Sequence, residues 1–299
     1  MQPPLSDHSK GLILTGIGGL MLTVDIPLIK LAAGDPWSVL LLRSGVTFIA
    51  ALLIWATWRR FWPPAPALVP GRAGLAVAAL YALTSITFIT AVYNTTTANL
   101  VFILAFGTMF AALLSWLFLG ERPRTATLIA MGVMVLGVLI IVGDGISAGN
   151  TFGDLMALAA AFFVASAITV SRASGRDMGF TALVAVILPF SVALIMVAQT
   201  GYRIDAPWWI ILNGAVVMPV SFYCLATGPR YISGPEVAMF YLLETVLAPV
   251  WVWLIFWEVP TTRSLIGGTI LIVALLAHSL WQLSQTRRRA ATRAIRRPA

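Results

Sequence analysis

The chain has 299 residues, of which 60% are hydrophobic and only 10% are charged, a composition that excludes an ordinary soluble domain with roughly 25% charged residues. Its formal net charge is +8, yet it contains a single cysteine and two histidines, so an intramolecular disulfide is impossible. One cysteine and two histidines are also too few for a cysteine metal cluster and leave little basis for a His-dependent catalytic triad. We therefore expect a protein that is not an enzyme and that needs no metal or cofactor.

Apolar runs long enough to cross a bilayer recur along nearly the whole chain. A hydrocarbon core about 30 Å thick requires roughly 20 apolar residues per helix. The sequence therefore predicts an all-α polytopic membrane protein with ten transmembrane helices, at 11–31, 37–57, 73–93, 98–119, 125–142, 154–172, 179–200, 208–227, 235–257 and 263–283. Asp25, Pro27 and Lys30 interrupt the first run, so we interpret it as an uncleaved span and not as a signal peptide.

A polar, glycine-rich link from Asp144 to Gly153 divides the chain into two units. We expect a first five-helix repeat over 10–143, a second five-helix repeat over 153–283 and a basic tail over 284–299. The tail is expected to be a solvated run against anionic lipid headgroups, with a partner-binding arm as the alternative. A charge distributed in this way gives no support to nucleic-acid binding.

The basic residues also predict the orientation of the chain. With the amino terminus in the cytoplasm, most of the lysines and arginines fall on the inner side, as the positive-inside rule requires. We therefore expect both termini, and the basic tail, to be cytoplasmic.

One stretch of the first half, 98–142, is repeated almost whole at 235–276. A shift of 137 positions aligns the two copies without a gap and pairs Glu121 with Glu258. We interpret both glutamates as parts of a turn at a helix start, near the positive end of the helix dipole, with a substrate contact as the alternative. Pro123 and its partner Pro260 are expected to open the helices that follow.

Five spans per repeat is an odd number, so the two copies enter the membrane from opposite sides. Two inverted five-helix repeats are a recurrent plan of secondary transporters, which hold substrate near the bilayer midplane between the halves. A channel, a receptor or a membrane enzyme does not require this symmetry.

The turn motifs resemble those of the drug/metabolite transporter superfamily, specifically its ten-helix EamA-type exporters. The resemblance covers residues 10–283 and is carried by Leu119-Gly120-Glu121-Arg122-Pro123 with Leu128-Ile129, and by Trp257-Glu258-Val259-Pro260 with Leu265-Ile266-Gly267. The second copy departs by having Trp257 where the family often has glycine.

This resemblance implies efflux of a small-molecule substrate through the inner (plasma) membrane of a bacterium, by alternating access of a central cavity. Within the family the general texture is similar to that of aromatic amino-acid exporters, which implies export of neutral and aromatic amino acids. The alternatives are an exporter of another small metabolite or drug and, in another class, a non-transporting membrane enzyme or receptor. The expected partners are the substrate and the lipid bilayer, and we expect a monomer.

Two charges lie within the first two spans. Each costs roughly 3 kcal/mol on insertion scales, so such residues are functional candidates. At ~1.5 Å per residue, Asp25 and Arg43 both come out roughly 9 Å below the outer surface. We hypothesise an ion pair between them that acts as a structural or gating brace, with a substrate site as the alternative.

Glu244 lies close to the midplane of the ninth span, where the first repeat has Gly107. The architecture of the repeat therefore does not demand a carboxyl group at this position. Glu244 is either a satisfied structural carboxyl or a group that handles protons or substrate.

Hydroxyl, amide and aromatic side chains recur at helical spacing in spans three, four, eight and nine. Together they would line a mostly apolar cavity suited to small amphipathic solutes, whereas the alternative is ordinary packing between membrane helices. These substrate-binding candidates are Tyr81, Thr84, Ser85, Phe88, Asn99, Phe102, Phe106, Ser221, Tyr223 and Tyr241, together with Glu244.

Overall fold

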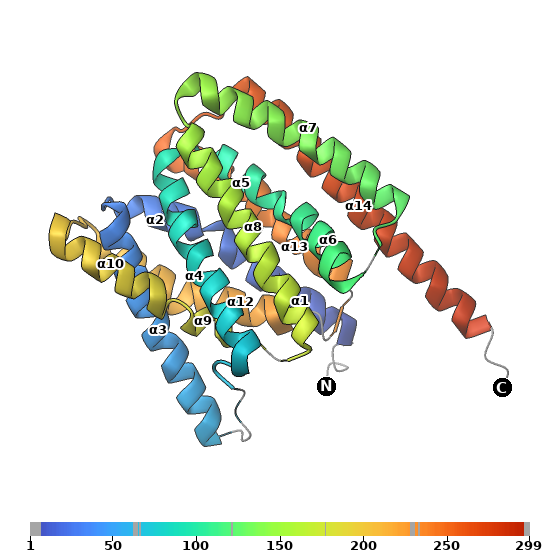
Figure 1. The fold of residues 1–299 in the computed structure, drawn as a ribbon, viewed down its shortest axis with the longest axis horizontal. Coiled ribbons are helices and arrows are strands. Elements are labelled where there is room, and N and C mark those ends of the chain that lie inside the picture. The colour runs from blue at the N-terminus through green and yellow to red at the C-terminus, as the bar shows by residue number, and fades with distance from the viewer. Residues whose placement is uncertain are drawn as a thin grey trace, which may run out of the picture.

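A computed structural model describes residues 7–61, 65, 67–120, 122–176, 178–227, 231–232 and 234–295. The first half of the chain contains α1 (Asp7–Thr23), α2 (Asp25–Leu31), α3 (Pro36–Phe61), α4 (Gly71–Asn94), α5 (Thr97–Ala105), α6 (Gly107–Leu119) and α7 (Thr125–Ala148) (Figure 1). The second half contains α8 (Thr151–Ser174), α9 (Thr181–Val184), α10 (Ile187–Thr200), α11 (Pro207–Leu212), the π-helix η1 (Asn213–Val217), α12 (Met218–Thr227), α13 (Gly234–Phe256) and α14 (Thr262–Ile295).

Each of the ten expected spans corresponds to one helix or to consecutive helices, which confirms the all-α polytopic fold class. Within the described residues, nine helical segments are long and apolar enough to cross a bilayer. The remaining span corresponds to the 23-residue helix α13. The chain is a multi-pass membrane protein.

Three of the spans are broken near a proline, for a reason visible in the backbone. A proline has no N–H to donate to the carbonyl four residues earlier. Pro27 therefore cannot bond to the carbonyl of Thr23, where α1 ends, and Pro189 cannot bond to that of Ala185, between α9 and α10. Pro219 follows η1 in the same way, whereas α13 continues through its internal proline.

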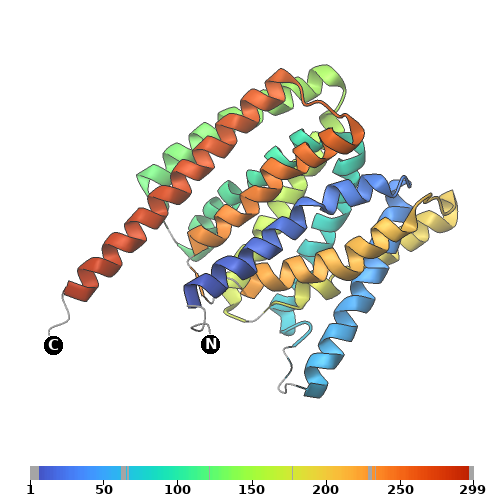
Figure 2. The same cartoon turned by 180° about the vertical axis from the view of Figure 1, so that it is seen from behind.

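The packing of the helices repeats between the two halves. The first span, α1, packs against α12 of the eighth span, and the third span, α4, packs against α8 of the sixth. The second and seventh spans pair through α3 and α10, and the fifth and tenth pair through α7 and α14, which form one edge of the molecule (Figures 1 and 2). Exchanging the two five-helix units leaves this set of pairs unchanged, as expected for inverted repeats.

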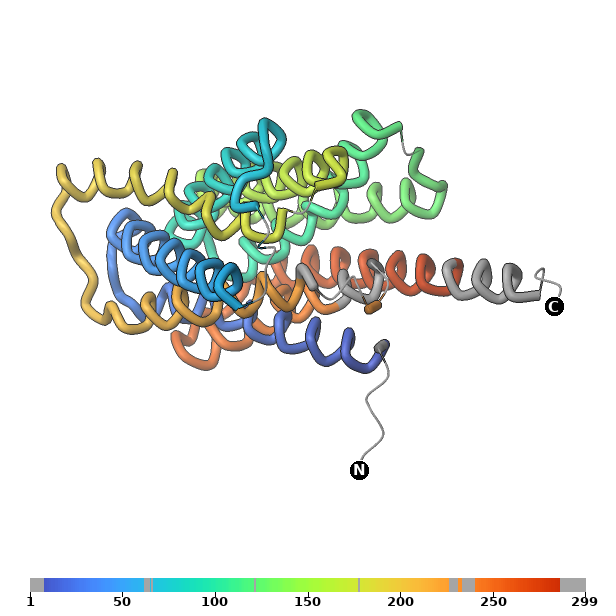
Figure 3. The backbone as a smooth tube through the Cα atoms, turned by 90° about the horizontal axis from the view of Figure 1, so that it is seen from below, coloured from blue at the N-terminus to red at the C-terminus, as the bar shows by residue number. Residues whose placement is uncertain are grey.

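One end of the bundle, which we call the distal end, is where α2 and α13 end and where α5 and α8 begin. Helix α1 begins and helix α14 ends on the other side of the molecule (Figures 1 and 3). The largest buried apolar cluster lies toward the distal end and includes Ile29 of α2, Leu40 of α3, Ile89 of α4 and Leu100 of α5. Helix α13 packs against α2 and α5 there, which joins the two halves.

Candidate functional site

The central polar site is built where two helix irregularities meet. Asp25 is the first residue of α2, directly after the break that follows α1, and Asn213 is the first residue of η1. Asn213 Nδ2 donates to Asp25 Oδ1 at 2.6 Å and to the Asp25 carbonyl at 3.3 Å. Where a membrane helix is broken or has a π-bulge, some backbone groups are left out of the regular helical hydrogen bonds, and such breaks occur where helices line a functional interior. This junction is therefore a candidate functional site.

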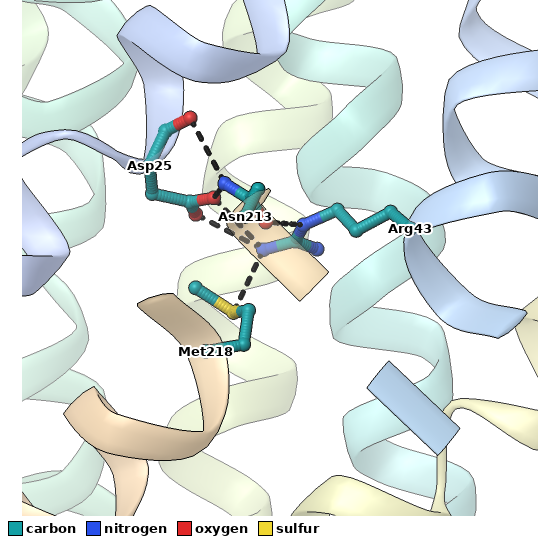
Figure 4. A network of polar contacts seen from close by, with 4 residues as sticks. All are labelled: Asp25, Arg43, Asn213 and Met218. Atoms are coloured by element: carbon teal, nitrogen blue, oxygen red, sulfur yellow. Dashed lines mark hydrogen bonds and ion pairs between the residues drawn. The ribbon is translucent and has the colours of Figure 1, made fainter. Parts of the chain in front are cut away.

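Arg43 of α3 completes the site (Figure 4). Its Nη2 lies 3.1 and 3.0 Å from the two carboxylate oxygens of Asp25, and its Nε donates to Asn213 Oδ1 at 3.1 Å. The Sδ of Met218 lies 3.0 Å from the same Nη2, and the guanidinium carbon lies 5.7 Å from the centroid of the Phe88 ring. The structure thus places the two charges of the hypothesised pair in direct contact.

The burial of this pair explains why it carries so many partners. Asp25 is 3% exposed, Arg43 is 8% exposed and Asn213 is fully buried. Removing a charge from water costs several kcal/mol. This cost can match the whole attraction between the two charges of an ion pair, unless hydrogen bonds within the protein replace those lost to water. Asn213 supplies those bonds to both partners, which holds the guanidinium in one orientation.

Glu244 of α13 faces the same interior. It lies within electrostatic range of Asp25 and Arg43, and its side chain is half-buried. Tyr241, one turn earlier, lies within electrostatic range of Glu244 and of Tyr81 on α4. The side chain of Tyr241 is 46% exposed, and that of Tyr81 is half-buried.

The polar and aromatic residues of the fourth span lie between helices. Asn99 is buried and donates from Nδ2 to Asp154 Oδ1 at 3.3 Å, and it accepts from the hydroxyl of Ser264. Phe102 is buried against Gly268, where a Cβ atom would collide with its ring. Phe106 makes an edge contact with Phe110, at 5.3 Å between centroids.

The remaining candidates lie in the third and eighth spans. Thr84 donates to the carbonyl of Leu80 at 2.9 Å, Ser85 is half-buried, and Phe88 packs beneath Arg43 as described above. Ser221 is fully buried, and its hydroxyl has no hydrogen-bond partner among the described residues. Tyr223 is 48% exposed and its ring lies 6.3 Å from that of Trp58 on α3.

A second buried carboxylate occupies the distal end. Asp154 lies in the first turn of α8 with no exposed surface, and it accepts hydrogen bonds from the Thr95 hydroxyl and from Asn99. Through Asn99 it is linked to Ser264 of α14, so the network ties three spans together. Sequence reasoning missed Asp154 because an acidic residue at a span start is also the ordinary complement of a helix dipole.

Glu258 has a different role from the expected one. Its Oε1 accepts the backbone N–H of Thr97 at 2.6 Å, and its Oε2 pairs with Lys30. Helix α14 begins at Thr262, and the hydroxyl of Thr261 accepts the N–H of Ser264 at its start. Glu258 therefore complements the start of α5 in the other repeat, and not the start of its own helix; Glu121 lies outside the described residues.

Two further observations bound the chemistry of the interior. Within the described part of the chain, no group of three or more His, Cys, Asp or Glu side chains is placed to hold a metal ion. A half-open hollow of about 280 Å³ lies between α5, α13 and α14, lined almost wholly by apolar side chains such as Phe102, Pro249 and Trp253. It lies beside α13 and is separate from the site around Arg43.

Comparisons with known proteins identify a family and several relatives. The sequence model of the EamA-like transporter family matches it twice, over residues 9–143 and 151–280. The pseudopaline exporter CntI of Pseudomonas aeruginosa, strain UCBPP-PA14, is 26% identical over 174 residues, which cover 57% of this chain and 61% of that protein. The riboflavin transporter of Vibrio cholerae is 24% identical over 184 residues, which cover 60% of this chain and 61% of that protein.

The alignments to these two relatives thus span less than two thirds of their length. A protein of known crystal structure superposes on the chain with a TM-score of 0.63 at 14% identity, and the match covers 91% of this chain and 97% of that one. This likeness supports the fold.

Proposed function

Because the chain belongs to the EamA-like transporter family, we propose that it exports neutral and aromatic amino acids and related small metabolites across the bacterial inner membrane by alternating access. The chain is then a secondary transporter with both termini in the cytoplasm, working as a monomer. Its two repeats, 10–143 and 153–283, would rock against each other around the interior site, and the basic tail 284–299 would lie against the cytoplasmic leaflet.

The observation that carries this proposal is the chemistry of the interior. Glu244 lies within electrostatic range of the buried Asp25–Arg43 pair, and Tyr241 lies within electrostatic range of Glu244 and Tyr81. A mostly apolar interior with a few oriented charges and phenols suits a small solute that is apolar at one end and polar at the other. Neutral and aromatic amino acids have that character.

The relatives favour a second candidate of the same kind. One is an exporter of pseudopaline and the other a transporter of riboflavin, so small metabolites other than amino acids are candidate substrates. A non-transporting membrane enzyme or receptor has less support, because the family is one of transporters.

Counterflow in proteoliposomes tests the proposal. Vesicles loaded with an unlabelled neutral amino acid, such as phenylalanine, should accumulate the labelled form through the purified chain, with and without an imposed pH gradient. Riboflavin in the same assay serves as the comparison solute. If the chain exchanges riboflavin but none of the neutral amino acids, the second candidate replaces the first.

A further inference from the structure

The guanidinium group of Arg43 uses two of its three nitrogens in the contacts described above. Nε and Nη2 are occupied by Asn213, Asp25 and Met218, whereas Nη1 has no hydrogen-bond acceptor in the part of the chain that the structure describes (Figure 4). The side chain is only 8% exposed. A guanidinium group whose other nitrogens are fixed in this way is well suited to bind a carboxylate.

The orientation of that nitrogen is set by its neighbours. Asn213 and Asp25 hold two edges of the guanidinium plane, and Phe88 lies against its face at 5.7 Å. A donor that is held in place before the ligand arrives loses little conformational freedom on binding. Nη1 is therefore a preorganised donor.

Glu244 supplies the opposite charge. It forms neither a hydrogen bond nor an ion pair within the described residues, although it lies within electrostatic range of Arg43 and Asp25. Asp25 and Arg43 neutralise each other, so an ionised Glu244 is an uncompensated negative charge beside this pair. Such a charge attracts a cationic group, and aromatic rings of the kind that Tyr241 and Tyr81 carry nearby add to the binding of ammonium groups.

We propose that this site recognises both charged ends of an amino-acid zwitterion, with Arg43 Nη1 donating to the carboxylate and Glu244 accepting from the ammonium group. The side chain of the amino acid would then lie in the apolar remainder of the interior. This inference rests on the proposed function and deepens it, because a solute lacking either charged end makes only one of the two contacts.

Three ligands separate the two contacts. L-Phenylalanine carries both charged groups, phenethylamine lacks the carboxylate and 3-phenylpropionate lacks the ammonium group. Their dissociation constants are measured by calorimetry on the purified full chain, in the wild type and in Glu244→Gln and Arg43→Lys. Glu244→Gln should weaken phenylalanine and phenethylamine by roughly ten- to a hundredfold, as for a charged hydrogen bond, and leave 3-phenylpropionate unchanged. Arg43→Lys should weaken phenylalanine and 3-phenylpropionate and spare phenethylamine.

The control variant is Glu244→Asp, which keeps the charge and should keep the preference for ligands with an ammonium group. If Arg43→Lys fails to fold, the Glu244 variants decide alone, because Glu244 has no bonded partner among the described residues whose loss would unfold the protein.

The outcomes separate this inference from the proposed function. If the wild type exchanges amino acids but Glu244→Gln weakens all three ligands equally, or alters only the response to a pH gradient, the zwitterion site is wrong and the transporter stands. If the wild type exchanges no amino acid, both are wrong.

Discussion

The carboxylate of Glu258 joins Lys30 at the end of α2 to the first backbone N–H group of α5. Lys30 and Thr97 belong to the first repeat and Glu258 to the second, so the contact fastens the two units at the distal end. The side chains of Lys30 and Glu258 are 21% and 24% exposed, so water screens the attraction between their charges only in part. A conformational cycle that opens the distal end has to break this contact.

Removing the charge of Glu258 should loosen the distal end. We expect Glu258→Gln to lower the free energy of unfolding by about 0.5–2 kcal/mol, because the ion pair with Lys30 is lost and a neutral amide oxygen accepts the Thr97 N–H more weakly than a carboxylate does. Unfolding of the detergent-solubilised protein in a series of SDS mole fractions measures this change.

A charge swap provides the control. Lys30→Glu combined with Glu258→Lys restores the ion pair but leaves the Thr97 N–H facing an ammonium group, which cannot accept. The swapped protein should therefore remain at least as unstable as Glu258→Gln. Full recovery of stability would mean that the ion pair, and not the cap on α5, is the important contact.

The Asp25–Arg43 pair should respond differently to the same manipulation. Alanine at either position strands a buried charge and should cost about 3–5 kcal/mol. Swapping the two residues should partly restore folding and transport, because the Asn213 amide can turn over and exchange its donor and acceptor. Asn213→Leu should abolish the rescue. Expression level, unfolding in SDS and counterflow measure the three effects, and the absence of any coupling between positions 25 and 43 would contradict the brace.

Some of this architecture could be predicted from the sequence because its signals are strong and local. Runs of about 20 apolar residues define the spans, and a proline lacking its N–H marks where Pro27 and Pro189 break them. The contact between Asp25 and Arg43 follows from counting depth along two neighbouring spans. These properties depend on residues near one another in the chain or on the thickness of the bilayer.

The partners of the other polar groups could not be predicted because they depend on how helices far apart in sequence pack. Asn213 is a polar residue in an apolar span, a signal that marks it as a candidate, but its partner Asp25 lies 188 residues away. Glu258 reaches Thr97 across 161 residues. Phe102 lies on one stripe of its helix, but its contact with Gly268 depends on where α14 packs.

The crossing of α7 and α14 should tolerate no side chain at its closest point. A Cβ atom at Gly137 would lie 2.8 Å from the carbonyl oxygen of Gly267, and one at Gly267 would lie 2.7 Å from that of Gly137. Because the obstacle is backbone, Gly137→Ala and Gly267→Ala should each cost about 1–3 kcal/mol, the usual penalty for overpacking. Gly132→Ala on the same helix meets nothing within 4 Å and should be neutral or stabilising in the same SDS titration. Equal behaviour of the three variants would contradict the close approach.

The buried carboxylate of Asp154 allows the sharpest test of the distal network. A Cβ atom at Gly145 would collide with Asp154 Oδ2, so Gly145→Ala should push the carboxylate away from Thr95 and Asn99 and destabilise the protein. Gly143→Ala, two residues earlier on α7, meets no neighbouring atom within 4 Å and is the matched control.

The cause of that destabilisation can be isolated with a double-mutant cycle. Asp154→Ala alone leaves the partner groups of the carboxylate unpaired and should cost about 1–3 kcal/mol for each buried group left unsatisfied. Once the carboxylate is gone, Gly145→Ala has nothing to displace, so the two changes together should cost less than their sum, by about 0.5–3 kcal/mol. Additive losses would show that Gly145 is needed for the path of α7 itself. A coupling energy would show instead that this glycine is there to make room for Asp154.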